Sequence, residues 1–462
     1  MTVSVVIPQE VAEEIQSIAN HPKETAGVML VGVAEASNGD IRLLVRCIRW
    51  VGEAAYSRRE WHGMTIQSEG YVHALAEAET FGAACIWIHT HPGEDASPRP
   101  SEHDHIVDGE IADLFRLRSG SPYYGTLIFS SRSPGLVFTG YLQREGSDTL
   151  QIERLWQIGN RWRLIRAYDS SLPQLSPVFD RNVRAFGAAI QQTLGDLAIG
   201  IVGCGGTGSS VAEQLVRLGV RNLTLVDPDE LSESNVTRVY GSTALDIGKP
   251  KVQVLNRHLM HIAPDLHCEI VQSMVTLESA ARCLIGCDVV FGCTDDNAGR
   301  LVLSRLATYL LTPVIDCGVL LSSDVGGQLT GIDGRVTILS PGHACLICRD
   351  RIDLARAGAE LLTPDERVRR EDEGYAPALA QVEPAVVAFT TLVGSSAVSE
   401  LLERLIGYGP EPRPSEVLLR CHEREISTNI AQPRIGHYCH PSSCKLGIGM
   451  TQPFLEQIWP TS

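Results

Sequence analysis

The chain has 462 residues, of which 44% are hydrophobic and 20% charged, and its formal net charge is −16 at pH 7. This length predicts more than one domain. The negative charge argues against general nucleic-acid binding, and no apolar run approaches the length of a membrane span. Because the start of the chain lacks a signal-peptide pattern and 13 Cys are scattered along it, we expect a cytoplasmic protein.

Residues 1–147 are predicted to form a compact α+β domain, and residues 148–175 are interpreted as a polar linker with some helical character. Apolar periodicity and runs place the elements of this domain. The predicted elements are a helix at 8–20, a strand at 26–32, a helix at 68–80, a strand ending at His89, a loop at 92–103, and strands at 124–129 and 136–142.

Residues 176–462 alternate between strand-like and helix-like patterns, which predicts a mostly parallel, doubly wound α/β sheet. The charge-rich stretch at 364–374 is expected to be a mobile surface loop. The other predicted elements are strands at 197–202 and 223–226, a glycine-rich loop at 203–208, a helix at 209–218 that Gly219 ends, and later strands at 289–291 and 314–315.

His89 and His91 lie two residues apart at the end of an apolar run. Side chains at positions i and i+2 of a strand point the same way, so both imidazoles can face one metal ion. Asp104 follows in the next segment and completes three ligands with an open position, the arrangement of a catalytic zinc. Glu24 is the candidate base for the bound water, and Ser101 is a candidate donor to an oxyanion.

These residues, in this order and with Pro92 after His91, resemble the JAB/MPN (JAMM) metallo-isopeptidases over about residues 5–145. The resemblance implies a cytidine-deaminase-like α+β fold and a peptidase that cuts after the terminal glycine of a ubiquitin-like protein. It implies zinc on the two histidines and the aspartate, a general acid/base at Glu24 and oxyanion assistance from Ser101. The interval before Asp104 is two residues longer than is usual in that family, which leaves Glu102, His103 and His105 as alternative ligands.

The loop with Gly203, Gly205, Gly206 and Gly208 follows a strand and opens a helix. Glycines let the backbone approach phosphates, and the start of a helix presents free N–H groups to them. The acid that ends the next strand, Asp227, stands where ribose hydroxyls are usually bound. Taken alone, this pattern predicts generic dinucleotide binding.

Asp227 is followed in order by Asp229, Asn235, Arg238, Lys251 and Asp295. This series resembles the ubiquitin-activating superfamily, in particular its ThiF/MoeB type, over about residues 175–450. The resemblance implies adenylation of a ubiquitin-like or sulfur-carrier β-grasp protein with ATP and Mg²⁺. Arg238 and Lys251 would neutralise the phosphates, and Asp295 would hold Mg²⁺. Arg181 resembles a residue that the family supplies from a partner subunit, which implies a homodimer. The implied nucleotide-binding residues are Gly203, Gly205, Gly206, Gly208, Asp227, Asp229, Asn235, Arg238, Lys251 and Asp295.

Two cysteine pairs, Cys345 with Cys348 and Cys439 with Cys444, predict a structural zinc site with four thiolate ligands. The ThiF/MoeB type carries such a zinc. His437 and His440 are possible substitutes, because the second pair is more widely spaced than usual. Residues 350–419 hold no Cys, so we expect adenylation without a stable thioester on this chain; Cys421 is a distant candidate.

The chain is thus expected to be a bifunctional enzyme of a bacterial-type ubiquitin-like pathway, with a zinc peptidase followed by an adenylyltransferase. A conjugating enzyme is a possible further partner. One alternative is sulfur-carrier activation, in which the adenylated tail becomes a thiocarboxylate for cofactor or cysteine synthesis. Another is a scaffold that retains both folds without turnover.

Overall fold

The computed structural model describes residues 2–61, 63–93, 97–132, 135–168, 170, 174–372 and 385–460. The chain divides into two compact units. The first consists of Met1–Leu172 with the short segments Tyr309–Leu311 and Cys444–Thr451, and the second contains the remainder. Within the described residues, no helix combines the length and the apolar character needed to cross a bilayer.

The first unit is built around a sheet that closes on itself. Its strand order is β1-β3-β2-β6-β7-β8-β9-β10. Strand β9 also pairs in parallel with β1, so the first seven strands of this order form a ring, and β10 pairs with β9 outside it. The strands are β1 (Val3–Pro8), β2 (Thr25–Glu35), β3 (Ile41–Trp50), β6 (Ala84–His91), β7 (Tyr123–Arg132), β8 (Gly135–Arg144), β9 (Thr149–Ile158) and β10 (Arg163–Arg166). A separate hairpin pairs β4 (Tyr56–Arg59) with β5 (Met64–Ile66).

Apolar clusters cover both faces of this sheet. One includes helix α1 (Gln9–Ala19), and the other includes α2 (Glu69–Phe81) and α3 (Glu102–Ser119). Neighbouring residues of β6 belong to different clusters, Ile86 to the first and Trp87 to the second. Strand residues alternate between faces, so a strand covered on both sides is apolar throughout. This double burial explains the continuous apolar run and fixes the strand end that carries His89 and His91.

The interpretation of residues 148–175 as a polar linker with some helical character is wrong for two parts of that segment. Residues 149–158 form β9, which closes the ring against β1, and residues 163–166 form β10. Trp156 and Trp162 are buried and pack with ring centroids 6.2 Å apart. Ring closure joins segments about 150 residues apart, and local periodicity carries no information about such a pairing.

The second unit contains a mixed sheet in the order β13-β12-β11-β14-β15-β16-β17-β18. The four pairings from β13 to β15 are parallel, as the predicted doubly wound sheet requires, and the three from β15 to β18 are antiparallel. The strands are β11 (Ala198–Val202), β12 (Asn222–Val226), β13 (His267–Val271), β14 (Val289–Gly292), β15 (Val314–Ser323), β16 (Leu329–Leu339), β17 (Glu416–Arg420) and β18 (Glu425–Asn429).

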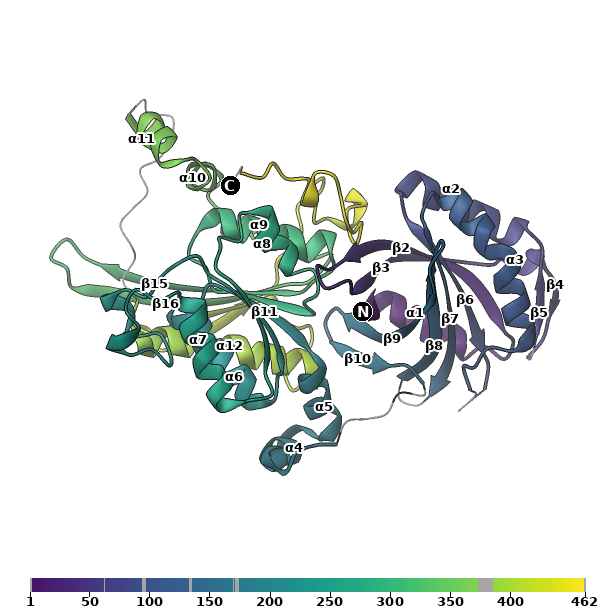
Figure 1. Ribbon diagram of the computed structural model, residues 1–462, viewed down its shortest axis with the longest axis horizontal. Coiled ribbons are helices and arrows are strands. Elements are labelled where there is room, and N and C mark those ends of the chain that lie inside the picture. Colours follow the sequence, from purple (N-terminus) through teal and green to yellow (C-terminus); the bar gives the residue numbers. More distant parts are fainter. Residues whose placement is uncertain are drawn as a thin grey trace. The chain divides into compact units, whose positions relative to one another are not determined.

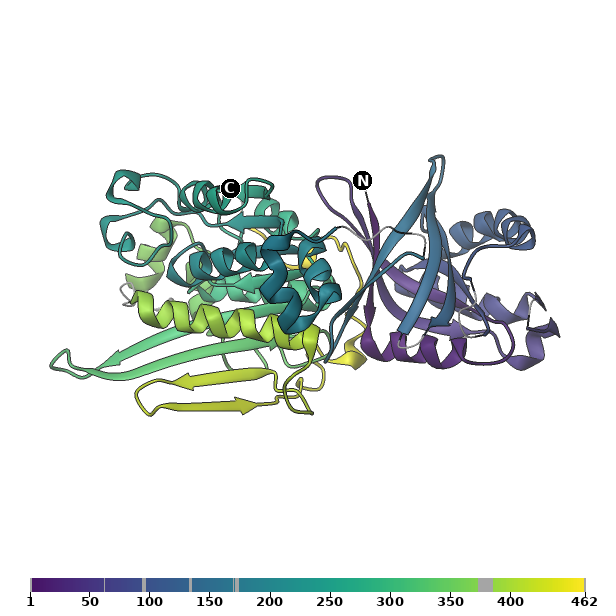
Figure 2. The same ribbon diagram turned by 90° about the horizontal axis from the view of Figure 1, so that it is seen from below.

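Helices cover both faces of the parallel part of this sheet, with α6 and α7 on one side and α8 and α9 on the other (Figure 1). The longest of the unit's described helices, α12, packs along α6 and along the β15–β16 hairpin, which extends beyond the helices (Figure 2). The helices are α4 (Asp180–Phe186), α5 (Ala188–Asp196), α6 (Gly206–Leu218), α7 (Lys251–Ile262), α8 (Glu278–Cys283), α9 (Asn297–Tyr309), α10 (Leu354–Glu360), α11 (Pro364–Asp372) and α12 (Val387–Ile406).

Residues 364–372 form helix α11, so the prediction of a surface loop at 364–374 is wrong for that part of the stretch. Thr363 caps the helix through a reciprocal bond with Glu366, whose carboxylate accepts from the Thr363 hydroxyl at 2.9 Å. This is a capping box, a helix-start signal that outweighs the high charge of the segment. Residues 373 and 374 lie outside the described part.

Candidate functional sites

The predicted metal ligands of the first unit come together. One ligand atom from each of His89, His91 and Asp104 lies within 4.8 Å of the other two. The Nε2 atoms of the two histidines are 3.3 Å apart, and Asp104 Oδ1 lies 3.5 Å from Nε2 of His89. The alternatives Glu102, His103 and His105 are exposed and fall outside this group.

The donor chemistry of this group fits a divalent cation. His91 Nδ1 donates to the Ser97 carbonyl oxygen at 2.8 Å, which leaves the lone pair of its Nε2 facing the other ligands. Burial lowers the pKa of His89 to about 4, so this ring is neutral at pH 7. Two imidazole nitrogens and a carboxylate oxygen within 4.8 Å of one another match the ligand set of a catalytic zinc.

Helix α3 positions Asp104. Ser101 is its N-cap, with a capping box in which the Ser101 hydroxyl accepts from Asp104 N at 3.2 Å and donates to Asp104 Oδ2 at 2.7 Å. One turn on, the buried carboxylate of Asp108 accepts hydrogen bonds from Tyr124 (2.7 Å) and Tyr141 (2.6 Å). The helix is thereby tied to β7 and β8, and the longer loop before it does not displace Asp104 from the histidines.

The Ser101 hydroxyl is therefore engaged in orienting Asp104, and its predicted contact with an oxyanion stays a prediction. Glu24 lies just before β2, where its N–H donates to the Glu60 carbonyl and its own carbonyl accepts from Arg59 Nε at 2.8 Å. Burial raises the pKa of Glu24 to about 7, and the charge of Asp104 adds to this shift. A carboxyl group with a pKa near neutrality suits a residue that takes up and returns a proton.

The glycine loop of the second unit connects β11 to α6 at the carboxyl edge of the sheet. Gly203 has φ +91°, and a Cβ on Gly208 would lie 1.8 Å from the Gly203 carbonyl oxygen, so both positions require glycine. A Cβ on Gly206 would lie 2.9 Å from the Thr390 hydroxyl, whereas one on Gly205 would meet no described atom within 4 Å. Gly205 is thus the position where the loop surface is open to a ligand.

Asp227 ends β12 beside this loop. Its carboxylate accepts from the backbone N–H of Cys204 (2.6 Å) and of Asp229 (2.9 Å), and its remaining lone pairs can accept from a ribose. The Lys251 ammonium donates to Asp229 Oδ2 at 2.7 Å. Asp229 thus connects the predicted phosphate-binding lysine to Asp227, which accepts from the Asp229 N–H. The structure thus brings together the glycine loop, Asp227, Asp229 and Lys251.

The other predicted nucleotide-site residues are placed as follows. Asn235 is buried and closes a capping box with Ser232. The Arg238 guanidinium donates to the Ser234 carbonyl oxygen at 3.2 Å. Asp295 is exposed, and it is Asp296 that binds the start of α9 through Gly299 N. Arg181 is exposed on α4, and its action in a second subunit stays a prediction.

Three polar residues near this edge were not singled out from the sequence. Asp316, fully buried on β15, pairs with Arg335 Nη2 at 2.7 Å and with Arg300 Nε at 3.4 Å. Its Oδ1 lies 3.4 Å from where a Cβ on Gly292 would stand, at the end of β14. Nothing in the sequence signals that Asp316 pairs with Arg335 and Arg300.

The structure groups three of the four cysteines predicted to bind zinc with His437, one of the two histidines that the sequence left open as substitutes. Cys345, Cys348, His437 and Cys439 form a group of possible metal ligands, which does not include Cys444. Cys444 is exposed and lies in the segment Cys444–Thr451, which is part of the first unit. His437 Nδ1 lies 3.6, 3.4 and 3.2 Å from the sulfurs of Cys345, Cys348 and Cys439. Such distances are close to the edges of roughly 3.5 Å that a tetrahedral zinc site has.

The chain is similar to known adenylyltransferases. The chain is 32% identical over 151 residues to the sulfur carrier protein ThiS adenylyltransferase of Escherichia coli, covering 33% of this chain and 56% of that protein. It is 28% identical over 251 residues to the E. coli molybdopterin-synthase adenylyltransferase, covering 53% of this chain and 88% of that protein. The chain thus spans little more than half the length of the first of these relatives.

Among solved structures, the complex of E. coli MccB with MccA-N7isoASN has a TM-score of 0.46 and 16% sequence identity, covering 57% of this chain and 75% of that one. The model of the ThiF family matches residues 179–440, which include the glycine loop, Asp227, Lys251 and the cluster around His437. This match spans more than half of the chain, and the protein therefore belongs to the ThiF family.

Proposed function

We propose that the second unit adenylates the C-terminal carboxylate of a ubiquitin-like protein with ATP. A carboxylate oxygen attacks the α-phosphorus, the bond to the β-phosphate breaks and pyrophosphate leaves. Membership of the ThiF family and the adenylyltransferase names of the relatives support this reaction. The observation that carries it is the meeting of the glycine loop, Asp227 and Lys251 at one edge of the sheet.

The residues of this edge divide the work by charge. The loop amides and the start of α6 face the phosphates, and Asp227 holds the ribose. Lys251 now pairs with Asp229, and a triphosphate would compete for the same ammonium. Arg238 would add a second positive charge against the developing pyrophosphate, and Asp295 would bind Mg²⁺. Arg181 would complete the site in a homodimer.

The adenylated tail is expected to pass to a nucleophile of another protein. Cys204, in the glycine loop, is fully buried, and burial raises the pKa of its thiol well above the usual value. Cys317 is also buried. A thiol held neutral and out of solvent is a poor nucleophile, because thioester formation requires the thiolate. Cys204 therefore does not suit thioester formation.

ATP–pyrophosphate exchange tests this function in the full-length protein with a β-grasp protein that ends in glycine. We expect exchange with the wild type and its loss on Asp295→Asn. Asp324→Asn, which changes an exposed carboxylate in the β15–β16 hairpin, is the matched control and should retain exchange. Absence of exchange in the wild type would favour a scaffold, and a thiocarboxylate product with a sulfur donor would favour sulfur-carrier activation.

A second activity is favoured by the ligand group of the first unit. We propose that this unit is a zinc peptidase that cuts after the terminal glycine of the same ubiquitin-like protein. His89, His91 and Asp104 would hold the zinc, which supplies Lewis acidity to the scissile carbonyl and to a water. Glu24 would take the proton of that water and deliver it to the leaving amine.

Cleavage of a ubiquitin-like protein extended beyond its terminal glycine tests this second activity. Glu24→Gln keeps the size of the side chain but removes the base, and we expect cleavage to fall by about 10²-fold or more while the zinc content is unchanged. Glu13→Gln, on the exposed face of α1, is the matched control. Cleavage at the wild-type rate by Glu24→Gln would show that the proposed role of this residue is wrong.

A further inference from the structure

The segment that carries Arg238 is a series of tight turns after β12. Arg238 N and Val239 N both donate to the Asn235 carbonyl oxygen, at 2.9 and 3.0 Å, and the Ser242 hydroxyl donates to the Val239 carbonyl at 2.7 Å. These bonds are local, so they shape the segment but do not set its position relative to the glycine loop. That position depends on contacts with neighbouring helices.

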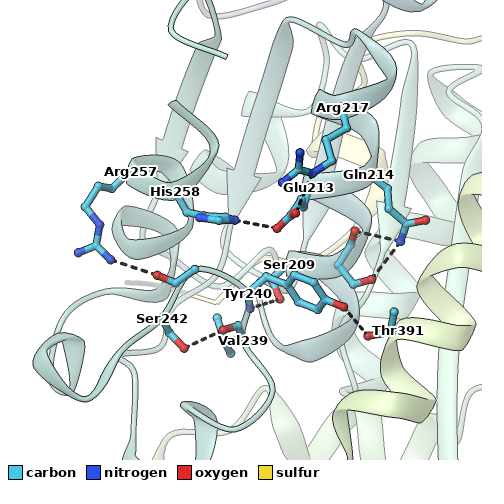
Figure 3. A network of polar contacts seen from close by, with 12 residues as sticks. Ser209, Glu213, Gln214, Arg217, Val239, Tyr240, Ser242, Arg257, His258 and Thr391 are labelled. Carbon is cyan, nitrogen blue, oxygen red and sulfur yellow. Dashed lines mark hydrogen bonds and ion pairs between the residues drawn. The ribbon is translucent and has the colours of Figure 1, made fainter. Parts of the chain in front are cut away.

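Tyr240 makes two such contacts, one from each end of the residue (Figure 3). Its backbone N–H donates to the hydroxyl of Ser209 at 3.0 Å, and Ser209 is a fully buried residue of the first turn of α6. Its phenol oxygen lies 2.9 Å from the hydroxyl oxygen of Thr391, near the start of α12. Tyr240 thus connects the Arg238 segment to both helices that border the glycine loop.

A second set of contacts holds the far side of the same segment (Figure 3). Gly241 has φ +74° and lies so close to α7 that a Cβ would be 2.2 Å from Cγ of His258. His258 Nε2 lies 2.7 Å from a carboxylate oxygen of Glu213 on α6, and Arg257 Nη2 donates to the Gly241 carbonyl at 3.2 Å. These contacts keep the backbone of the segment against α7 without reaching the Tyr240 phenol.

We propose that Tyr240 is a positioning residue that holds Arg238 toward the phosphates of ATP, a role that rests on the adenylation proposed for this unit. Arg238 stands two residues before Tyr240, and its guanidinium makes one hydrogen bond, to Ser234, within the described part of the chain. The side chain itself is therefore lightly held. Its reach toward the glycine loop is set by the backbone that Tyr240 ties to Ser209 and Thr391.

Titration of the full-length protein with MgATP and with AMP tests this role. Tyr240→Phe removes the hydroxyl and keeps the ring, and Thr391→Val removes its partner at constant size. Loss of one hydrogen bond predicts about three- to tenfold weaker binding of MgATP by either variant, and no further loss in the double variant. Binding of AMP should be unchanged, because Arg238 acts on the outer phosphates. Tyr408→Phe, which loses a bond to the Ser399 carbonyl beyond the other end of α12, is the matched control.

The decisive measurement repeats Tyr240→Phe in an Arg238→Ala background. If Tyr240 acts through Arg238, the phenylalanine substitution no longer changes MgATP binding there, while its effect on the melting temperature stays the same. Equal weakening in both backgrounds, or equal weakening for AMP and ATP, would overturn the positioning role. Failure of the wild type to bind MgATP would instead count against the proposed function itself.

Discussion

At the scale of single residues, the metal clusters depend on which side chains the fold brings together. Two close cysteine pairs in the sequence predict four thiolates, but the second pair is split between the two units. Cys439 lies beside Cys348, with sulfurs 3.6 Å apart, while Cys444 has a left-handed backbone with φ +57° and lies outside the cluster. His437 takes the remaining position, two residues before Cys439.

Replacing His437 should therefore lower the zinc content, and replacing Cys444 should not. We expect His437→Ala to lose about one equivalent of zinc relative to the wild type and to have a lower melting temperature, because a structural zinc contributes to folding. Cys444→Ser should keep both properties. Inductively coupled plasma mass spectrometry and thermal unfolding measure them. Loss of zinc from Cys444→Ser together with a normal zinc content in His437→Ala would show that the four cysteines, and not His437, bind the zinc.

The metal group of the first unit was more predictable than this cluster. His89 and His91 were expected from strand periodicity, and Asp104 from the carboxylate in the segment that follows them. The sequence did not predict how α3 is held in place. Two tyrosines, one on β7 and one on β8, donate hydrogen bonds to Asp108 of this helix. These hydrogen bonds join residues on different elements of the chain. Tyrosine and aspartate are common residue types, so their presence in the sequence does not indicate the pairing.

At the scale of elements, α6 approaches the glycine loop closely at Gly208 but not at Gly205. The two glycines look equivalent in the sequence, yet they have different structural roles. We expect Gly208→Ala to unfold the loop region or to abolish nucleotide binding, because its Cβ would overlap the Gly203 carbonyl. Gly205→Ala should fold normally, since its φ of −73° suits alanine and its Cβ meets open space. Its methyl group would face the phosphates, so MgATP should bind more weakly.

Circular dichroism melting curves and MgATP titration of these two variants distinguish the outcomes. An unchanged melting temperature in Gly208→Ala would mean that α6 does not approach the loop as closely as the structure has it. Normal MgATP binding by Gly205→Ala would mean that the phosphates do not pass over this position. The two results are independent, because one concerns packing and the other concerns the ligand.

The turn between β12 and α7 is held by one carboxylate. Asp246 accepts hydrogen bonds from Arg257, at 2.6 and 2.9 Å, from Lys249 and from Thr243. The Arg257 hydrogen bonds, with those from Lys249 and Thr243, hold the pKa of Asp246 well below its usual value. A carboxylate with a lowered pKa in the folded state adds stability above the pKa of the unfolded chain, about 3.9, and loses it as the pH falls further.

Asp246→Asn should accordingly lower the free energy of unfolding by about 1–2 kcal/mol at pH 7, the scale of losing charge-assisted hydrogen bonds to half-exposed partners. The difference from the wild type should shrink as the pH falls below about 4. Urea unfolding at a series of pH values measures both. A difference that grows on acidification would mean that the substitution acts through packing and not through the charge.

Elements with a strong local pattern were predicted well, and elements made by distant pairing were not. The strand, glycine loop and helix at 198–218 follow directly from glycine placement and apolar periodicity. Strand β9 was missed because its partner β1 lies at the other end of the unit. Strand β17 was missed for a related reason, since it pairs with β16, a strand about 80 residues earlier.

At the scale of the whole molecule, the two proposed activities meet at one chemical group. A ubiquitin-like precursor that extends beyond its terminal glycine has no free carboxylate at that glycine, so it cannot be adenylated there. Cleavage by the first unit would create the carboxylate that the second unit uses. The proposed order of the two reactions is therefore fixed by the chemistry of the substrate and does not depend on how the units are arranged.

This order predicts a difference between precursor and mature substrate in ATP–pyrophosphate exchange. With the mature, glycine-ended protein, wild type and Glu24→Gln should exchange equally. With the extended precursor, the wild type should exchange after a lag and Glu24→Gln should not. Adding Asp295→Asn protein, which is expected to cleave but not to adenylate, should restore exchange to Glu24→Gln. Exchange by Glu24→Gln alone on the precursor would mean that adenylation does not require the glycine carboxylate, which would separate the substrates of the two units.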